Sequence, residues 1–252
     1  MKIGVCCGIS MAEEVKALGY DYVEENLNRL ADMSESEFEE LKARYEAIGI
    51  PVYSTNCFFP GSISLYAEDG LAQVTTYAEK ALARAAQLGV EICVLGSGNA
   101  RAIPEGADPE EISNKFSAIV AEIDRIAGKY GIRIAIEPLR VKETNFIHTV
   151  TEAMEIVKRS GAENVGALVD FYHFHMNGEA DDGLTPAGEK LIHAHIARPN
   201  EDRRMPMEED IPTVDKWAAM LRDIGYSGNL SLEGRFDLEA LKETKAIVDR
   251  FR

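Results

Sequence analysis

The sequence predicts an α/β fold, a single-domain (β/α)8 TIM barrel formed by residues 1–252. Short apolar runs rich in β-branched residues alternate with segments of helical periodicity, and the alternation repeats eight times. A length of 252 residues suits eight such units in one domain. The chain shows no linker-like segment and no break in composition, so a closed barrel is favoured over an open, doubly wound sheet.

The strands are predicted where a short apolar or β-branched run precedes a change to polar residues. The first of them lies at the N-terminus, which lacks the apolar core and cleavage site of a secretory leader. The eight predicted strands are Lys2–Cys7, Tyr20–Glu25, Pro51–Cys57, Val90–Leu95, Ile132–Glu137, Val165–Asp170, Leu191–Ile196 and Asn229–Glu233.

Helices are predicted between the strands from apolar residues at helical spacing. Ile112, Phe116 and Ile123 recur in this way, and the last helix is predicted over roughly Leu238–Arg252. Glycine stands at the end of most helical patterns, where a left-handed C-cap is expected before the next strand. The glycines in this position are Gly19, Gly49, Gly89, Gly131, Gly161 and Gly225.

The chain carries 27 basic and 43 acidic side chains, which gives a formal net charge of −16. Such a surface repels phosphate backbones at long range, so we expect no nucleic-acid partner. No apolar run is long enough to cross a bilayer, and we therefore expect a cytoplasmic protein without a membrane partner. The four cysteines lack zinc-site spacing and are expected to be reduced thiols.

Four consecutive predicted strands each carry, at or near the carboxyl end, a side chain that can bind a metal ion. These side chains are Glu137, Asp170, His195 and Glu233. Active sites of this fold lie at the carboxyl ends of the strands, so the four are expected to meet at one rim. Three carboxylates and one imidazole form an oxygen-rich set that suits one divalent ion, Mn²⁺ first, with Mg²⁺, Co²⁺ or Zn²⁺ as alternatives.

A divalent ion at this rim would have open positions for two neighbouring substrate oxygens, such as those of a hydroxyketone. It would act as a Lewis acid on the carbonyl and stabilise an enediolate. A carboxylate beside it could then serve as the general base at carbon. The predicted reaction is therefore proton abstraction next to a carbonyl group.

The motifs around these residues resemble the sugar phosphate isomerase/epimerase superfamily, the xylose-isomerase-like TIM barrels. Within it, the chain looks most similar to the ketose 3-epimerase and hydroxypyruvate isomerase branch. The resemblance covers the whole chain and is densest between residues 132 and 235. The motifs that carry it are IEPLRVKETNF, LVDFYHF, HAHIARP and GYSGNLSLEGR, which contain the four predicted ligands in order.

The resemblance implies that Glu137 and Glu233 are both metal ligands and the acid–base pair. One glutamate would remove the proton alpha to the carbonyl, and the other would return a proton from the opposite face. Inversion at carbon needs two bases, one for each face, which agrees with this pairing. The resemblance further implies substrate contacts from Glu143 and His173, a carbohydrate substrate, free or phosphorylated, and a homodimer or homotetramer.

The chain departs from the family pattern where the substrate is expected. Between the two glutamates of the strand-five motif the family usually has Asn-Arg and an aromatic residue, whereas this chain has Arg140, Val141 and Lys142. The family often places a substrate-binding arginine after strand seven, and no arginine stands at that offset here. Arg203 is our candidate for this role, and Arg198 is the second choice.

Three further features adjoin the predicted rim. The loop Gly96–Arg101 is predicted to be a tight turn, with anion binding through its backbone or through Arg101 as the alternative. Glu24 ends a strand and is expected either to touch substrate hydroxyls or to hold another side chain. His193 shares strand parity with His195, so it is expected to point into the barrel.

Three other functions remain open. A dehydratase of a keto-polyol, of the inosose type, would use the same proton abstraction and then lose the neighbouring hydroxyl. An apurinic-endonuclease-like phosphodiesterase shares the barrel and the four ligands, but such nucleases carry further zinc-binding histidines that this chain lacks. A metabolite-binding barrel without activity would be expected to have a broken ligand set, whereas here the four ligands and Glu143 are all present.

Overall fold

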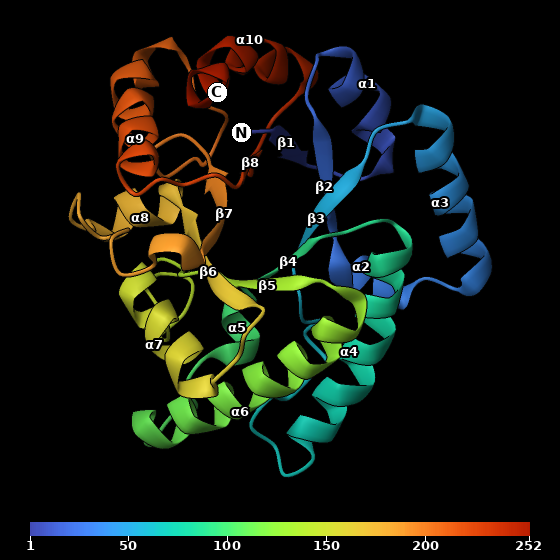
Figure 1. Cartoon of the computed structure of the whole chain (residues 1–252), viewed down its shortest axis with the longest axis vertical. Coiled ribbons are helices and arrows are strands. Elements are labelled where there is room, and N and C mark those ends of the chain that lie inside the picture. Colours follow the sequence, from blue (N-terminus) through green and yellow to red (C-terminus); the bar gives the residue numbers. More distant parts are fainter.

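The computed structural model describes residues 1–252 and has the predicted (β/α)8 architecture. Eight parallel strands close into a barrel in sequence order, with β8 pairing back to β1. Figure 1 shows the strands at the centre and the helices around them. The strands are β1 (Ile3–Cys6), β2 (Tyr22–Asn26), β3 (Val52–Asn56), β4 (Ile92–Leu95), β5 (Arg133–Ile136), β6 (Val165–Asp170), β7 (Leu191–Ile196) and β8 (Asn229–Leu232).

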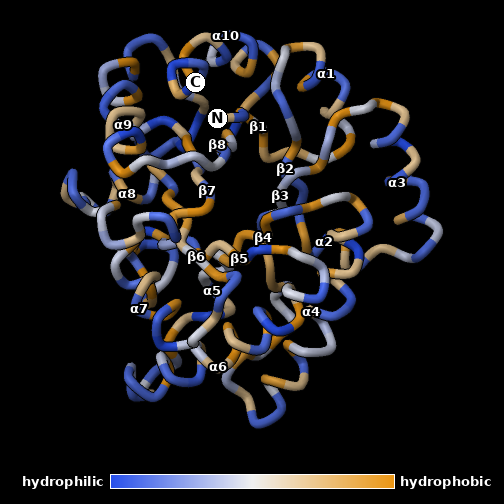
Figure 2. Tube along the Cα trace, viewed as in Figure 1, coloured by the Kyte–Doolittle hydropathy of each residue, from blue (hydrophilic) through white to orange (hydrophobic).

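The helices form an outer ring, and in Figure 2 the central strands are more hydrophobic than the outer turns of this ring. The α-helices are α1 (Ala12–Ala17), α2 (Leu27–Asp32), α3 (Glu35–Ile48), α4 (Gly70–Gln87), α5 (Gly98–Arg101), α6 (Pro109–Ala127), α7 (Val150–Ser160), α8 (Phe171–Asn177), α9 (Ile211–Asp223) and α10 (Leu238–Val248). The short 3-10 turns are η1 (Ile9–Met11), η2 (Gly128–Tyr130), η3 (Gly188–Lys190), η4 (Glu208–Asp210) and η5 (Asp249–Phe251).

The helix ends follow from local sequence. Ser34 and Thr149 each form a capping box with the glutamate three residues later, which satisfies free N–H groups at the starts of α3 and α7. All six glycines predicted at helix ends have positive φ, between 67° and 81°. At Gly49 and Gly161 this residue is the left-handed C-cap itself, a conformation that a side chain would strain.

The strand bounds place the rim residues. β6 and β7 have the predicted bounds, and the other strands begin or end within two residues of the prediction. Glu137 and Glu233 lie one position beyond β5 and β8, where the side chains turn toward the barrel mouth. Backbone bonds still hold both positions, because the Glu137 N–H donates to the Leu95 carbonyl (3.2 Å) and the Glu233 N–H to the Ile196 carbonyl (3.0 Å).

The apolar core lies mainly between the barrel and the helices, where 64 buried apolar residues form one cluster. A second cluster of five apolar residues comes from β4 to β7 alone, which places it inside the barrel. The barrel is therefore a packed core and not a pore, and any polar side chain within it needs a partner. The five residues are Ile92, Val94, Ala135, Leu168 and Ile192.

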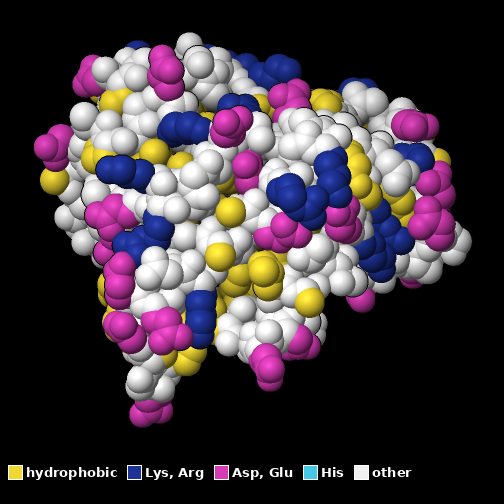
Figure 3. Space-filling model, turned by 60° about the horizontal axis from the view of Figure 1, so that its bottom comes forward, with side chains coloured by type: hydrophobic (Ala, Val, Ile, Leu, Met, Phe, Trp, Pro, Cys, Tyr) yellow, Lys and Arg dark blue, Asp and Glu magenta, His cyan; other side chains and the backbone are white.

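The surface carries both signs of charge. On the face in Figure 3, acidic and basic side chains are interspersed, and no continuous basic patch is visible there. Several of the arginines pair with carboxylates, such as Arg159 with Glu110. None of the helices combines the length and the apolar content that a membrane span requires.

Glu179 follows α8 and contacts the start of α7. Its partly buried carboxylate accepts a hydrogen bond from the Val150 N–H at the start of α7 (3.3 Å). Burial raises the pKa of Glu179 from 4.5 to about 7 despite this bond. The folded protein therefore keeps a proton that the unfolded chain loses, so the free energy of unfolding falls as the pH rises through this range.

We expect Glu179→Gln to be more stable than the wild type at pH 8, by on the order of 1–2 kcal/mol after allowance for solvent screening. The difference should vanish near pH 4, where the wild-type carboxyl is protonated in both states. Urea unfolding at the two pH values measures this. Glu155→Gln, at an exposed site on α7, is the control and should have the wild-type stability at both pH values. If Glu179→Gln were stabilised equally at pH 4 and pH 8, the raised pKa of Glu179 would be contradicted.

Candidate functional site

The four residues predicted as ligands meet at the carboxyl-terminal rim of the barrel. One ligand atom from each lies within 4.8 Å of the corresponding atoms of the other three. They come from consecutive strands β5 to β8, and parallel pairing with a continuous register brings these strand ends together. The four residues are Glu137, Asp170, His195 and Glu233.

His195 is the side chain that the other members of the cluster surround. Its Nδ1 lies 3.0 Å from Glu233 Oε2 and 3.5 Å from Glu137 Oε1, while its Nε2 lies 2.8 Å from Glu24 Oε1. Burial of the ring by itself would lower the pKa of His195. The carboxylates of Glu24 and Glu233 outweigh burial and raise this pKa well above its ordinary value.

The two glutamates of the cluster differ in proton affinity. Burial, and then repulsion from Glu233, raise the pKa of Glu137. Burial would also raise the pKa of Glu233, but the positive charges of His195 and Arg203 outweigh it and hold that pKa below its usual range. The Asn56 amide donates to Glu233 Oε1 (3.0 Å) and orients this carboxylate.

Asp170 joins the start of α8 to the cluster. Its Oδ1 accepts a hydrogen bond from the Tyr172 N–H (2.8 Å), so it is the N-cap of α8. Its Oδ2 faces the cluster and lies 2.6 Å from Arg203 Nη2 and 3.4 Å from His173 Nε2. The cap therefore fixes which carboxylate oxygen is available at the rim.

Arg203 reaches the cluster from the segment between β7 and α9. Its Nη2 lies 2.6 Å from both Asp170 Oδ2 and Glu233 Oε2, and its guanidinium covers the ring of Tyr172 at 4.8 Å. The structure thus brings the first-choice arginine to the site. The second choice was wrong, because Arg198 turns away and pairs with the carboxylates of η4.

A cavity of about 330 Å³ adjoins the cluster, near the lower end of the range of about 300–1,000 Å³ for ligand pockets. Glu137, Glu233, Glu143, His173 and Arg203 all line it, so the predicted substrate residues and two of the predicted ligands share this cavity. Four non-glycine residues in the chain have a left-handed backbone, and three of them line this cavity. Such strain is typical of functional sites. The three are Cys57, Ser97 and Arg203.

His173 presents a hydrogen-bond donor to this cavity. Its Nδ1 accepts from the Arg140 N–H (3.3 Å), so the proton of the neutral ring lies on Nε2. That nitrogen is buried and makes no hydrogen bond within the protein. Glu143 lies beside it, with Oε2 at 3.9 Å from His173 Nε2, and is held through Oε1 by Arg140 (2.7 Å).

The loop after β4 is the predicted tight turn, which leads directly into α5. The alternative role for Arg101, binding of an anion at the rim, is wrong because its side chain is fully buried. Its guanidinium donates instead to the carbonyls of Leu95 (3.2 Å), Glu137 (2.7 Å) and Ile147 (3.4 Å). Arg101 therefore supports the backbone under Glu137.

Sequence reasoning missed three residues of the site. Asn56 ends β3, so the strand-end rule that identified the four ligands would also have found it. Arg140 and Tyr172 carry no comparable signal, because the stacking of Arg140 and Arg203 over the Tyr172 ring is a tertiary contact between two loops and α8.

The residues present fit a divalent cation. Glu137 Oε1 is buried and accepts no hydrogen bond, and His195 Nδ1 points toward two carboxylates. A Cβ at position 96 would lie 2.2 Å from Glu137 Oε2, so only glycine leaves room for this carboxylate. Buried carboxylates require positive charge or protons. Three carboxylates and an imidazole are ligands that divalent metal ions accept.

A second possible ligand group shares a member with the cluster and is not an independent site. It consists of Cys6, Glu24 and His195. Its imidazole nitrogen and carboxylate are already bonded to each other at 2.8 Å, so a metal ion between them would have to break that bond.

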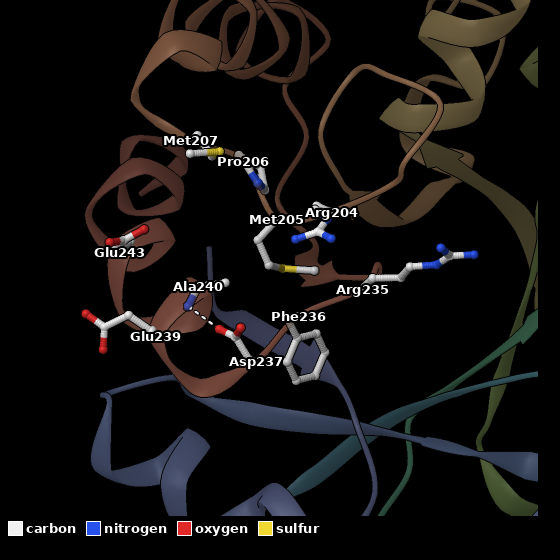
Figure 4. A pocket seen from close by; sticks show the side chains of 10 residues that line it. All are labelled: Arg204, Met205, Pro206, Met207, Arg235, Phe236, Asp237, Glu239, Ala240 and Glu243. Atoms are coloured by element: carbon white, nitrogen blue, oxygen red, sulfur yellow. Dashed lines mark hydrogen bonds between the residues drawn. The ribbon is translucent and has the colours of Figure 1, made fainter.

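A larger cavity of about 450 Å³ lies beside the site, between the segments that follow β7 and β8 (Figure 4). Arg204 and Arg235 line it, together with Asp237, which caps α10 by accepting from the Ala240 N–H (2.9 Å). Figure 4 shows the Arg235 side chain extending away from Asp237. No member of the ligand cluster lines this cavity, so we place the functional site at the smaller one.

We expect wild-type protein, purified without a chelating tag, to carry a divalent ion that His195→Ala loses, because the substitution removes the only nitrogen ligand of the cluster. Elemental analysis per chain measures this. His175→Ala removes an exposed imidazole on α8 and should retain the wild-type metal content. Equal metal content in His195→Ala and wild type would show that the four residues do not form the metal site.

In sequence, the chain is similar to proteins named as an epimerase and as an isomerase. D-psicose 3-epimerase of Agrobacterium fabrum is 28% identical over 230 residues, which cover 88% of this chain and 77% of that protein. Inosose isomerase of Halalkalibacterium halodurans is 26% identical over 233 residues, which cover 85% of this chain and 78% of that protein.

Solved structures share the fold. The 3-keto-D-glucoside 4-epimerase of E. coli superposes with a TM-score of 0.81 at 20% identity, over 99% of both chains. The IOLI protein, solved with a zinc atom, superposes with a TM-score of 0.77 at 22% identity, over 100% of this chain and 99% of that one. The family described as xylose isomerase-like TIM barrel matches residues 12–251. The chain therefore belongs to the xylose isomerase-like TIM barrel family.

Proposed function

We propose that the protein is a divalent-metal-dependent isomerase or epimerase that removes the proton alpha to the carbonyl of a ketose sugar or sugar phosphate. The observation that carries this proposal is the placement of Glu137 and Glu233 in the wall of one cavity, within reach of Asp170 and His195. The relatives named D-psicose 3-epimerase and inosose isomerase support this class of reaction.

The polar atoms of the cavity suit a substrate with several oxygens. Seven buried side-chain atoms of the protein make no hydrogen bond, and three of them belong to residues of this cavity. They are one acceptor, Glu137 Oε1, and two donors, His173 Nε2 and Arg203 Nε. Leaving such an atom unpaired costs about 1–3 kcal/mol, so a ligand with hydroxyl and carbonyl groups would recover that free energy.

Glu137 and Glu233 would move the proton. They reach the cavity from β5 and β8, with two strands between them, and in the proposed reaction each would act on one face of the substrate. One glutamate takes the proton from carbon, and the other delivers a proton to the opposite face. An epimerase runs in both directions, and each glutamate is therefore the base for one of the two epimers.

The substrate would be held by Glu143, His173 and Arg203. His173 Nε2 can donate to a substrate oxygen, because its Nδ1 already accepts from the Arg140 N–H. Glu143 can accept from a hydroxyl through Oε2, because its Oε1 is occupied by Arg140. Arg203 can donate through Nε, while its Nη2 remains on the two carboxylates of the cluster.

Glu137, Asp170, His195 and Glu233 would hold the divalent ion. When bound, the ion supplies Lewis-acid polarisation of the substrate carbonyl, which makes the neighbouring C–H more acidic. The zinc atom in the IOLI structure supports a divalent ion on this fold. Mn²⁺, Mg²⁺ and Co²⁺ suit the same oxygen-rich set and are the other candidates.

The experiment that tests this proposal also distinguishes two other reactions. Dehydration of a keto-polyol would begin with the same proton abstraction and would lower the product mass by one water. A phosphodiesterase with further zinc-binding histidines is disfavoured, because the residues that line the cavity at the end of β3 and after β3 and β4 include Asn56, Cys57, Ser97 and Asn99 and no histidine.

We expect the metal-loaded protein to introduce deuterium from D₂O at the carbon next to the carbonyl of one member of a ketose panel. Glu233→Gln and Glu137→Gln should each slow exchange by at least about 100-fold for the epimer whose proton the substituted glutamate removes. Mass spectrometry and proton NMR measure the exchange and separate inversion, carbonyl migration and loss of water.

Glu189→Gln, at an exposed site on η3 before β7, is the matched control and should exchange at the wild-type rate. Wild-type exchange with both epimers in Glu233→Gln would rule out its role as a base. No exchange with any ketose or keto-polyol, in protein shown to hold metal, would reject the isomerase proposal.

A further inference from the structure

Glu24 lies inside the barrel, and only 1% of the residue is exposed. Its Oε1 accepts from His195 Nε2 (2.8 Å), and its Oε2 accepts from His193 Nε2 (2.8 Å). The hydroxyls of Ser54 and Ser231 also donate to Oε2, at 2.6 Å each. Four donors from β3, β7 and β8 thus surround one carboxylate, and only its ionised form can accept from all of them.

This arrangement determines where the His195 proton lies. Because Glu24 can only accept, the His195 nitrogen that faces it carries a hydrogen. In the neutral ring, the form that can bind a metal ion, the opposite nitrogen, Nδ1, is then the one with the lone pair, and it faces Glu137 and Glu233 at the barrel mouth. A metal ligand needs this lone pair, and the hydrogen bond on the far side fixes both the tautomer and the ring orientation.

We propose that Glu24 is a positioning residue that fixes His195 as a metal ligand through Nδ1. The inference rests on the proposed function, because it assumes a divalent ion at the cluster. Glu24 does not line the substrate cavity, so it acts on the site only through His195. The sequence left two roles for Glu24, contact with substrate hydroxyls or support of another side chain. We assign the second role.

His193 supports this assignment. It points into the barrel, as its parity with His195 predicts, and its Nδ1 is buried without a hydrogen-bond partner. Its proton therefore lies on Nε2, toward Glu24. His193, Ser54 and Ser231 hold the carboxylate from three strands, so Glu24 cannot turn away from His195 without leaving several buried donors unpaired.

The neighbouring residue provides a matched control. Glu25 is also 1% exposed, but it lies on the other face of β2 and accepts from the Tyr45 hydroxyl (2.6 Å) and the Ile9 N–H (3.2 Å). Glu25→Gln makes the same chemical change in an equally buried carboxylate without touching His195. A loss of metal affinity that arose only from general destabilisation would appear in both variants.

The first test is the affinity for Mn²⁺ and for Zn²⁺, measured by titration against a chromophoric chelator on the wild type, Glu24→Gln and Glu25→Gln. We expect Glu24→Gln to bind each metal about 10- to 100-fold more weakly than the wild type. Glu25→Gln should bind as the wild type does. Equal affinities of the two variants would overturn the role of Glu24 and leave the proposed function intact.

The second test needs no variant and stays valid if Glu24→Gln does not fold. In the zinc-loaded wild type, ¹⁵N-imidazole NMR should show one histidine with metal on Nδ1 and a slowly exchanging proton on Nε2. Zinc on Nε2, or a rapidly exchanging proton there, would overturn the inference although metal is bound. A wild-type protein that binds neither metal would overturn both the inference and the proposed function.

Discussion

Buried negative charge is concentrated at the carboxyl ends of β5, β6 and β8 and at Glu24 within β2. Four carboxylates, those of Glu24, Glu137, Asp170 and Glu233, lie around one imidazole, and Arg203 is the basic residue that bridges two of them. Carboxylates in such a place repel one another strongly unless cations or donors compensate them. The directions of the pKa shifts, the inward turn of Arg203 and the fit to a divalent ion all follow from this constraint.

Left-handed backbone conformations and a buried arginine hold these carboxylates in place. Arg101 donates to the carbonyls of Leu95, Glu137 and Ile147, and Gly96 leaves the space that the Glu137 carboxylate fills. Left-handed residues follow β3, β4 and β7 along the cavity wall. Strain of this kind persists only where the neighbouring structure fixes the conformation, which the packed barrel does here.

The same site geometry is compatible with more than one outcome for the substrate. Proton removal next to a carbonyl can lead to inversion, to migration of the carbonyl or to loss of a neighbouring hydroxyl, and these reactions differ only after the first step. In the proposed reaction, the second glutamate and the residues that orient the hydroxyls would therefore decide the product. Arg140 belongs to the segment that departs from the usual family pattern, so the substrate preference is expected to depend on it.

The periodicity of the chain and its strand ends were enough to predict the barrel, the strand bounds to within two residues and the identity of the four clustered side chains. This is possible because parallel strands in a closed barrel must end at one rim, and alternation along a strand decides which side chains point inward. The sequence alone therefore identifies the four clustered residues, which are Glu137, Asp170, His195 and Glu233.

The tertiary structure decided which loop arginine reaches the site, that Arg101 is buried, and that Glu24 bonds to His195. Those outcomes depend on loop backbones and on contacts between distant segments, such as the left-handed turn at Arg203 and its stacking on Tyr172, which no local pattern encodes.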